Sequence, residues 1–253
     1  MNKITLITGA TSGIGKSCAY IFAKHKHDLI LIGRRAERLE GISKDLISKY
    51  DINVLQLSFD IRNSEDVSKA IRSIPDDWKK IDILINNAGL AVGLSTIQDA
   101  EIEDWERMID TNVKGLLYIS RAVIPLMITN KRGHVINIGS IAGKEVYPNG
   151  NIYCATKHAV DALNKGMRMD LVKENIKVTQ IAPGAIETEF SIVRFKGDKS
   201  RADSIYDGYQ PLQPDDVAEV TYYTTTLPDH VNINDLVIMP TAQASSMVFN
   251  KSD

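Results

Sequence analysis

Short apolar runs alternate with longer amphipathic segments along all 253 residues of the chain. The runs are rich in isoleucine, leucine and valine, which is typical of strands that are buried on both faces of a sheet. Because these runs alternate with helical patterns, the sequence predicts an α/β fold with a doubly wound parallel sheet of about seven strands. The strands are expected at residues 4–8, 28–33, 53–58, 82–85, 134–139, 177–181 and 235–239.

No linker, repeat or low-complexity tract interrupts this alternation, so residues 1–253 are predicted to form a single domain. The longest helical patterns cover residues 101–130 and 152–174. The one long irregular segment, residues 187–214, is polar and charged. Long loops in compact domains are functional lids or disordered segments, and we interpret this one as a lid over a substrate.

The composition is that of an ordinary globular protein, with 43% hydrophobic and 25% charged residues. The net charge of −2 argues against nucleic acid or an anionic membrane as a partner. Cys18 and Cys154 have no spacing that suggests a disulfide or a metal site. No apolar run approaches the roughly 18 residues of a membrane span, and the N-terminus lacks the features of a signal peptide. We therefore expect a cytoplasmic protein without a metal.

A glycine-rich turn joins the first predicted strand to the first predicted helix. Its spacing is G-x-x-x-G-x-G, which differs from the G-x-G-x-x-G of the standard dinucleotide fingerprint. Glycines let the backbone approach a pyrophosphate, and the helix N-terminus presents unpaired N–H groups. The turn therefore predicts a Rossmann-like phosphate-binding loop, although a glycine turn without a ligand is the alternative. The residues expected to contact a dinucleotide here are Gly9, Thr11, Ser12, Gly13, Ile14 and Gly15.

Arg34 and Arg35 follow the second strand, where an NAD-binding fold usually carries an acid for the ribose 2′-hydroxyl. A guanidinium group suits a 2′-phosphate in both geometry and charge. NADP is therefore favoured over NAD, and an arginine pair on the surface of a helix start is the alternative.

Two further strand ends carry polar or small residues. Asp60, with Ile61 beside it, follows the third strand and is suited either to accept from an adenine amino group or to cap the next helix. The fourth strand is followed by Asn87, Ala88 and Gly89, which allow a cofactor to approach closely and can tie strand ends together. A hydrogen-bonded turn without a ligand is the alternative for this second group.

Tyr153 and Lys157 are four positions apart and share one face of a predicted helix. An unperturbed tyrosine has a pKa of about 10, and an ammonium group one turn away favours the phenolate and lowers that pKa. Ser140 follows the fifth strand, where its hydroxyl can reach a bound carbonyl. The three residues predict a proton-transfer site, although a Tyr-x-x-x-Lys motif by itself is more often a surface pair.

Asn112 lies inside the predicted helix at residues 101–130. Asparagine is a poor former of helix interiors, so its presence needs a local reason. A kink that holds water, a capping interaction and a hydrogen-bonded core amide explain it equally well.

Nearly all of these motifs lie directly after a predicted strand. Pro183 and Gly184 do so too, since they follow the sixth strand. In open α/β sheets, ligands bind outside the carboxyl ends of the strands. We therefore expect these residues to form one site.

The set of motifs and their order resemble the short-chain dehydrogenase/reductase family over essentially the full chain. The resemblance implies a nicotinamide cofactor whose ribose is held by Lys157 and whose carboxamide lies near Ile186 and Thr188. It implies that Asn112 holds a water which passes the proton to solvent, and that the protein is a homotetramer. The catalytic tetrad that it implies is Asn112, Ser140, Tyr153 and Lys157.

Within that family, residues 192–198 and 240–244 are similar to NADP-dependent 3-hydroxy acid dehydrogenases, which act on serine and L-allo-threonine. Such a substrate carries a carboxylate that needs a cationic partner when it is buried. The candidates are Arg194 in the predicted lid and Lys144, four residues after Ser140. The alternatives are a general ketone, aldehyde or 3-oxoacyl reductase, and a catalytically silent NADP-binding regulatory protein.

Overall fold

Seven parallel strands form one sheet in the order β3-β2-β1-β4-β5-β6-β7 in the computed structural model, which describes residues 2–252. The predicted doubly wound parallel sheet is thereby confirmed, and the predicted strands differ from the observed ones only at their ends. Most of the strands are buried on both faces, as their near-continuous apolar sequences predict. The strands are β1 (Ile4–Thr8), β2 (Asp28–Gly33), β3 (Val54–Ser58), β4 (Ile81–Asn86), β5 (Gly133–Ile138), β6 (Ile176–Pro183) and β7 (Asp235–Ile238).

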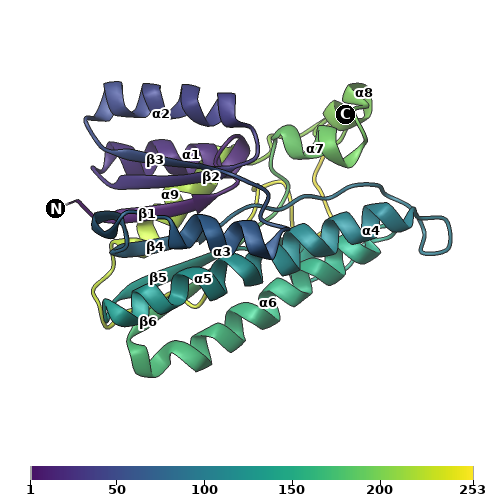
Figure 1. Ribbon diagram of the computed structural model, residues 1–253. Helices are drawn as coiled ribbons and strands as arrows, with labels where there is room; N and C mark the ends of the chain where they lie inside the picture. The colour runs from purple at the N-terminus through teal and green to yellow at the C-terminus, as the bar shows by residue number, and fades with distance from the viewer. Residues whose placement is uncertain (1, 253) are drawn as a thin grey trace.

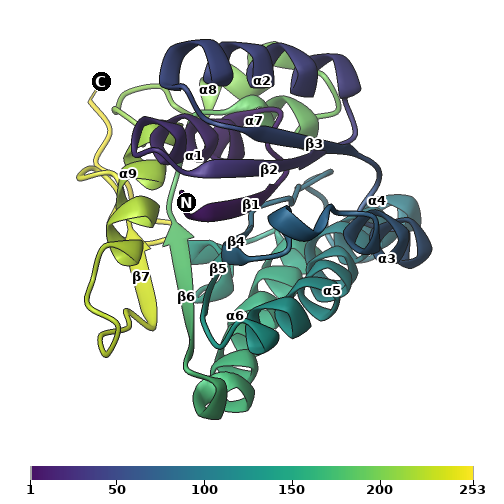
Figure 2. The same ribbon diagram turned by 60° about the vertical axis from the view of Figure 1, so that its left-hand side comes forward.

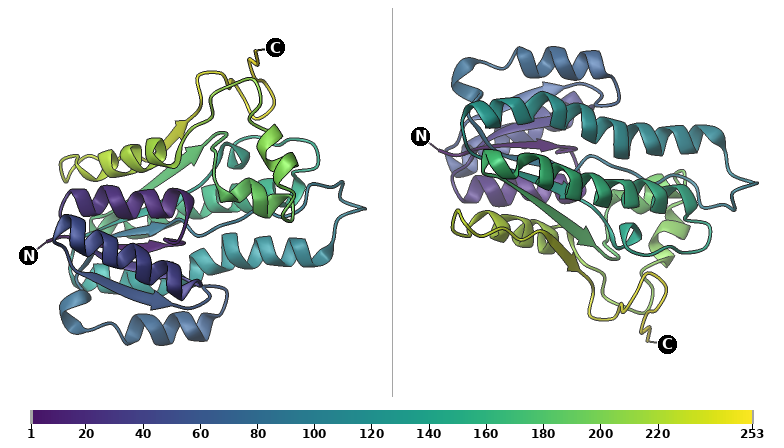
Figure 3. Two further views of the ribbon diagram at one scale, coloured as in Figure 1. Left: turned by 90° about the horizontal axis from the view of Figure 1, so that it is seen from above. Right: turned by 90° about the horizontal axis from the view of Figure 1, so that it is seen from below.

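Helices cover both faces of the sheet (Figures 1 and 3). Side chains alternate along each strand, so that in β1 Ile7 packs into one core and Leu6 into the other. The first core lies beneath α1 (Gly13–Lys24), α2 (Ala36–Tyr50) and α9 (Pro214–Thr225), and the second beneath α3 (Ser64–Arg72), α5 (Leu116–Thr129) and α6 (Asn151–Leu171). This sandwich holds the carboxyl ends of the strands in one row.

The segment expected to be one helix at residues 101–130 is instead three consecutive helical pieces. These are α4 (Ile102–Ile109), a π-helical turn (Asp110–Gly115) and α5. A π-turn widens a helix by one residue and is common at functional sites, and this one contains Asn112. Pro125 lies within α5 without ending it.

The segment at residues 187–214 was expected to be irregular, but it contains two short helices, α7 (Glu189–Arg194) and α8 (Lys199–Ser204). Figures 1 and 2 show them beyond the carboxyl ends of the strands and near the C-terminus. The backbone N–H of Ser252 donates to the carbonyl of Gly208 at 2.8 Å, so the end of the chain is tied to this segment. No helix in the described part of the chain is both long and apolar enough to span a membrane.

Candidate active site

A cavity of about 720 Å³ lies at the carboxyl ends of the strands. It is lined by residues from the glycine turn, the ends of β2, β4, β5 and β6, the start of α6, and the α7–α8 segment. Of the candidate residues chosen from the sequence, only Gly15, Asn112 and Lys144 are not part of its lining. The structure thus brings the other candidates together around one space.

The glycine turn leaves β1 beside the end of β4, where the strand order of the sheet reverses. Gly9 has a φ of +67°, and a Cβ at this position would lie 2.9 Å from the Cα of Ala88. The Asn87 amide donates to the carbonyl of Thr8 at 2.8 Å, and the Thr8 hydroxyl accepts from the backbone N–H groups of Asn87 and Ala88 at 3.0 Å each. The expected tie between these strand ends is therefore present.

Gly15 lies behind the turn rather than on the cavity wall. A Cβ here would collide with the Asn87 amide and the carbonyl of Gly9. The residue thus permits α1 to approach the strand ends closely, and it does not contact the cavity.

Tyr153 projects from the first turn of α6 into the cavity and is only 9% exposed. Burial raises the pKa of its phenol above the usual value, the neighbouring Tyr147 raises it further, and a hydrogen bond with Ser140 opposes this rise. The expectation that Lys157 lowers the Tyr153 pKa is therefore not met in this structure, because desolvation of the phenolate outweighs the favourable contacts.

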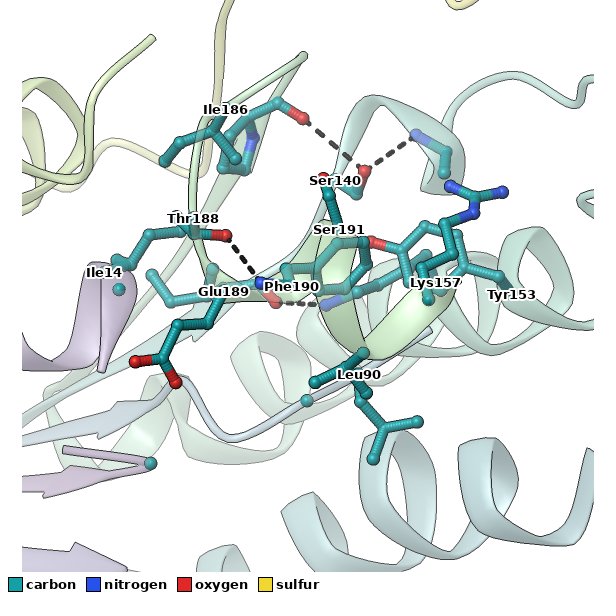
Figure 4. Close-up of a pocket in the computed structure, with 18 of the residues that line it drawn as sticks. Ile14, Leu90, Ser140, Tyr153, Lys157, Ile186, Thr188, Glu189, Phe190 and Ser191 are labelled. Atoms are coloured by element: carbon teal, nitrogen blue, oxygen red, sulfur yellow. Dashed lines mark hydrogen bonds between the residues drawn. The ribbon is translucent and has the colours of Figure 1, made fainter. Parts of the chain in front are cut away.

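Lys157 lies one turn along α6 and is 6% exposed. Its ammonium donates to the carbonyl of Ile138 at the end of β5, at 2.9 Å (Figure 4). Burial lowers the Lys157 pKa to about 8, since a charged ammonium loses hydration in the interior. Lys157 is therefore mostly protonated at neutral pH and places a cation beside Tyr153, although its pKa is only slightly above that pH.

Ser140 follows β5 and is the N-terminal cap of the short 3₁₀ helix Ile141–Gly143. Its hydroxyl accepts from the backbone N–H of Ala142 at 3.1 Å and lies 3.5 Å from the carbonyl of Pro183 (Figure 4). These contacts fix the hydroxyl next to the Tyr153 ring, where both groups can meet one substrate oxygen.

Asn112 reaches the site through its neighbours. Its amide oxygen accepts from the N–H of Leu90 at 2.8 Å, and its amide nitrogen donates to the carbonyl of Leu90 at 2.8 Å and to the Thr156 hydroxyl at 3.0 Å. A Cβ on Gly89 would lie between the Asn112 oxygen, at 3.2 Å, and the Lys157 ammonium, at 3.7 Å. Of the three explanations offered by the sequence, the hydrogen-bonded core amide is the one observed.

Charged residues gather at the far end of the cavity, after β2 and β3. Arg34 lies 3.7 Å from the Asp60 carboxylate, and Arg62 holds that carboxylate through Nη2 at 2.7 Å. Asp60 does not cap α3, because Asn63 does so by accepting from the backbone N–H groups of Glu65 and Asp66. Asp60 and Ile61 instead line the cavity.

Arg194 ends α7 with its guanidinium 5.7 Å from the centre of the Tyr153 ring and 5.2 Å from that of Tyr147. Its Nε is buried and has no hydrogen-bond partner within residues 2–252. The ring of Phe190 packs edge-on against Tyr153 with centroids 5.5 Å apart. Arg194 is thus a cation held among aromatic rings beside the reacting groups.

Lys144 does not reach the cavity, which corrects the expectation that it meets a substrate carboxylate. Its ammonium makes ion pairs with Asp161 on α6 and Asp235 on β7. Two carboxylates already satisfy its charge, and they lie outside the lining of the cavity.

Tyr147, Phe190 and Gln243 are site residues that sequence reasoning did not single out. Gln243 is buried and accepts from the N–H of Ala185 at 2.7 Å, which holds the backbone after Pro183 in place. Gln243 falls in the segment 240–244 that carried the subgroup resemblance, so a signal existed for it. Nothing in the local pattern distinguished the two aromatic residues from core residues.

Comparisons with known proteins agree with this geometry. Residues 3–198 match the family model described as short chain dehydrogenase. The chain is 46% identical over 242 residues to the NADP-dependent 3-hydroxy acid dehydrogenase YdfG of Salmonella typhi, covering 95% of this chain and 96% of the relative. It is 43% identical to sulfoacetaldehyde reductase 2 of Chromohalobacter salexigens, with 97% of both chains covered.

Among solved structures, the closed form of a serine dehydrogenase complexed with NADP⁺ superposes with a TM-score of 0.91 at 44% identity, covering 99% of this chain and 100% of the other. The family model spans well over half of the chain, and Ser140, Tyr153 and Lys157 face one cavity at the carboxyl ends of the strands. The chain belongs to the short-chain dehydrogenase family.

Proposed function

We propose that this protein is an NADP-dependent oxidoreductase that transfers a hydride between the cofactor and a small 3-hydroxy acid such as serine or L-allo-threonine. The named relatives support the reaction and the cofactor. The observation that carries the substrate class is the buried, unpartnered Nε of Arg194 next to Tyr153.

The cavity wall fits NADP along its length. Gly9 has a positive φ and no side chain, so the backbone of the glycine turn can approach a pyrophosphate. Arg34 and Arg35 offer guanidinium groups to a 2′-phosphate. Ile186 and Thr188 also line the cavity (Figure 4), and they would lie near the nicotinamide carboxamide. The bound cofactor supplies the hydride acceptor or donor.

In the oxidative direction, Tyr153 takes the proton of the substrate hydroxyl while a hydride leaves the carbon that bears this hydroxyl. Ser140 orients that oxygen by a hydrogen bond, and the Lys157 ammonium stabilises the phenolate that the proton transfer requires. Asn112 keeps Leu90 in place beside this group. Both N–H bonds of its amide nitrogen are used by Leu90 and Thr156, so a relay water at Asn112 would donate to an oxygen.

Arg194 is suited to hold the substrate carboxylate. In a 3-hydroxy acid, the carboxyl carbon is two bonds from the carbon that loses the hydride, so the anion must lie within a few ångströms of Tyr153. A buried donor without a partner costs free energy, and a carboxylate that accepts from Arg194 removes this cost. Residues 187–214 would then act as a lid that brings Arg194 to the substrate.

Arg194→Ala is expected to lower kcat/KM for serine or 3-hydroxybutyrate by about 10- to 100-fold, the loss of a charge-assisted hydrogen bond of roughly 1.5–3 kcal/mol. The efficiency for a neutral alcohol of similar size should change much less. Steady-state kinetics with both substrates measure this difference. Arg201→Ala removes another arginine of the same lid and is the control, because Arg201 stacks on Phe195 but is not itself part of the cavity lining.

An equal loss of efficiency for the acid and the neutral alcohol would show that Arg194 does not bind the carboxylate. If the unmodified enzyme already prefers the neutral alcohol, a general carbonyl reductase replaces the 3-hydroxy acid dehydrogenase. Cofactor binding without turnover on either substrate would favour a regulatory protein.

The relative named sulfoacetaldehyde reductase 2 favours a second candidate substrate class. A 2-hydroxyalkanesulfonate places its sulfur two bonds from the reacting carbon, as a 3-hydroxy acid places its carboxyl carbon. The same Arg194 donors would serve either anion. Adding 2-hydroxyethanesulfonate and 3-hydroxypropionate to the kinetic comparison decides between them, since the two molecules differ only in the anionic group.

We also propose that the chain forms a homotetramer in the cytoplasm. Large apolar side chains are exposed on α4, α5 and α6, among them Ile102, Leu117 and Met169, and closed symmetric assemblies are usual for soluble oligomers. Both cysteines are free and buried, which suits a reducing compartment. Light scattering at micromolar concentration should give four times the mass of the chain, and a monomer mass would contradict the assembly.

A further inference from the structure

The first residue of α7, Glu189, joins the lid to α2 by two ion pairs. Its carboxylate accepts from Arg38 Nη1 at 2.8 and 3.0 Å and from Arg35 Nη1 at 3.0 Å. Partial burial opposes ionisation of the carboxyl, yet the two guanidinium groups hold the pKa of Glu189 below its usual value. The carboxylate is therefore charged at neutral pH and bridges two elements that are far apart in the sequence.

The same network reaches the glycine turn. Arg35 donates to the Thr11 hydroxyl through Nη2 at 2.7 Å and through Nε at 3.1 Å, and to the Ser12 hydroxyl at 2.9 Å. Next to Glu189, the side chain of Thr188 lies 3.4 Å from where a Cβ of Gly13 would be. The start of the lid is thus fastened to the wall that faces the pyrophosphate and 2′-phosphate.

The two arginines differ in their relation to the cavity. Arg35 and Glu189 line it, and Arg38 does not. Figure 4 shows the Glu189 carboxylate turned to the side of the cavity where Ile14 lies, away from Tyr153 and Lys157. Arg38 therefore serves as an anchor for Glu189, whereas Arg35 has donors for both Glu189 and a cofactor phosphate.

We propose that Glu189 is a latch that fastens the lid over the cofactor groove through Arg38 and Arg35, and that it sets the rate at which NADP(H) leaves. The inference rests on the proposed cofactor. A latch of this kind has two opposing effects: it holds the lid over the bound cofactor, and its negative charge weakens the attraction of Arg35 for a phosphate.

The carboxyl end of α7 is fastened separately. Lys196 makes an ion pair with Asp104 at 2.8 Å, and the N–H of Gly93 donates to the carbonyl of Arg194 at 3.0 Å. Loss of the Glu189 contacts therefore loosens the start of α7 while its carboxyl end keeps its own contacts, and the protein should stay folded.

Glu189→Gln and Arg38→Gln are each expected to speed NADPH dissociation about threefold to fivefold, the modest effect typical of exposed ion pairs. NADPH should leave the double variant no faster than it leaves the faster of the two single variants, because both changes break the same Glu189–Arg38 ion pair. Stopped-flow fluorescence measures these rates. Hydrogen exchange of the cofactor-free protein should show faster exchange in α7 for both variants.

Binding of 2′,5′-ADP separates the latch from simple charge repulsion, because this fragment lacks the nicotinamide half that lies under the lid. Its affinity for Glu189→Gln should be equal to or higher than that of the unmodified protein, although NADPH leaves faster. Glu187→Gln is the matched control: Glu187 is also a lid carboxylate, but its partner is the Gln213 amide at 3.0 Å. It should leave the NADPH dissociation rate unchanged.

Dissociation rates within twofold of the unmodified protein for both single variants would overturn the latch. Slower NADPH dissociation from Glu189→Gln, together with tighter binding of 2′,5′-ADP, would also overturn it and leave only repulsion. Failure of the unmodified protein to bind NADPH at all would overturn the proposed function, and the latch with it.

Discussion

Tyr153→Phe is expected to lower kcat by about 10²- to 10⁴-fold, the usual contribution of a positioned general acid or base. The substitution removes one oxygen and keeps the ring that packs edge-on against Phe190, so the cavity should keep its shape. The Kd for NADPH should therefore change by less than about twofold. Turnover and equilibrium fluorescence titration with NADPH measure the two quantities.

Tyr147→Phe is the matched control for this loss. It makes the same chemical change six residues earlier, on a ring that lines the same cavity and lies beside Arg194. A fall of less than tenfold is expected, because Tyr147 takes no proton in the proposed reaction. Activity of Tyr153→Phe within tenfold of the unmodified enzyme would remove Tyr153 from its role.

The proposed role of Tyr153 as proton acceptor would account for the burial of two ionisable groups at a cost in free energy. Desolvation raises the Tyr153 pKa and lowers the Lys157 pKa to about 8, so burial opposes ionisation of both groups. The phenolate and the ammonium stabilise each other when both are charged. The positive nicotinamide ring of NADP⁺ adds to this stabilisation when it is bound. Burial thus penalises each charged group by itself, and the opposite charge beside it offsets part of that penalty.

The sheet and most of the site could be predicted from the sequence because their signals are local. Parallel strands buried on both faces read as unbroken apolar runs, and residues after the strands then meet at one edge of the sheet. The glycine turn and the Tyr153–Lys157 pair needed only strand–turn–helix order and helical spacing. Their convergence follows from the parallel topology.

The remaining features depend on contacts between distant segments. The π-turn around Asn112 has the same polar pattern as an α-helix, and what stabilises it is a pair of hydrogen bonds to Leu90. Lys144 is close to Ser140 in the sequence, but Asp161 and Asp235 draw it away from the cavity. Helices α7 and α8 have six residues each and are too short to give a clear period.

The proposed contacts of Arg34 and Arg35 with a 2′-phosphate should make the preference for NADP over NAD sensitive to substitution of these two residues. Arg35 is held in place by Thr11 and Ser12, so it meets a phosphate with little loss of side-chain freedom. Within residues 2–252, Arg34 has an ion pair only with Asp60, at 3.7 Å, and it would be free to turn to a second oxygen of a bound phosphate. We therefore expect the two arginines to make separate contributions to NADP binding.

Replacing both Arg34 and Arg35 with glutamine is expected to lower the ratio of kcat/KM for NADP to that for NAD by about 10²- to 10⁴-fold. Each lost charge-assisted hydrogen bond is worth roughly 1.5–3 kcal/mol, or about 10- to 100-fold. Solvent exposure of both side chains favours the lower end of this range. Steady-state kinetics with the two cofactors at one ionic strength give the ratio.

A double replacement of Lys69 and Arg72 on α3 with glutamine is the control, since it removes the same two positive charges away from the cavity. Its cofactor ratio should stay within about twofold of the unmodified enzyme, because charges separated by more than a Debye length of about 8 Å are largely screened at physiological salt. A similar fall in both double variants would mean that net charge, rather than contact with the phosphate, governs the choice. Equal efficiency of the unmodified enzyme with NAD and NADP would contradict the 2′-phosphate site itself, because two guanidinium groups beside a ribose favour the phosphorylated cofactor wherever they can reach it.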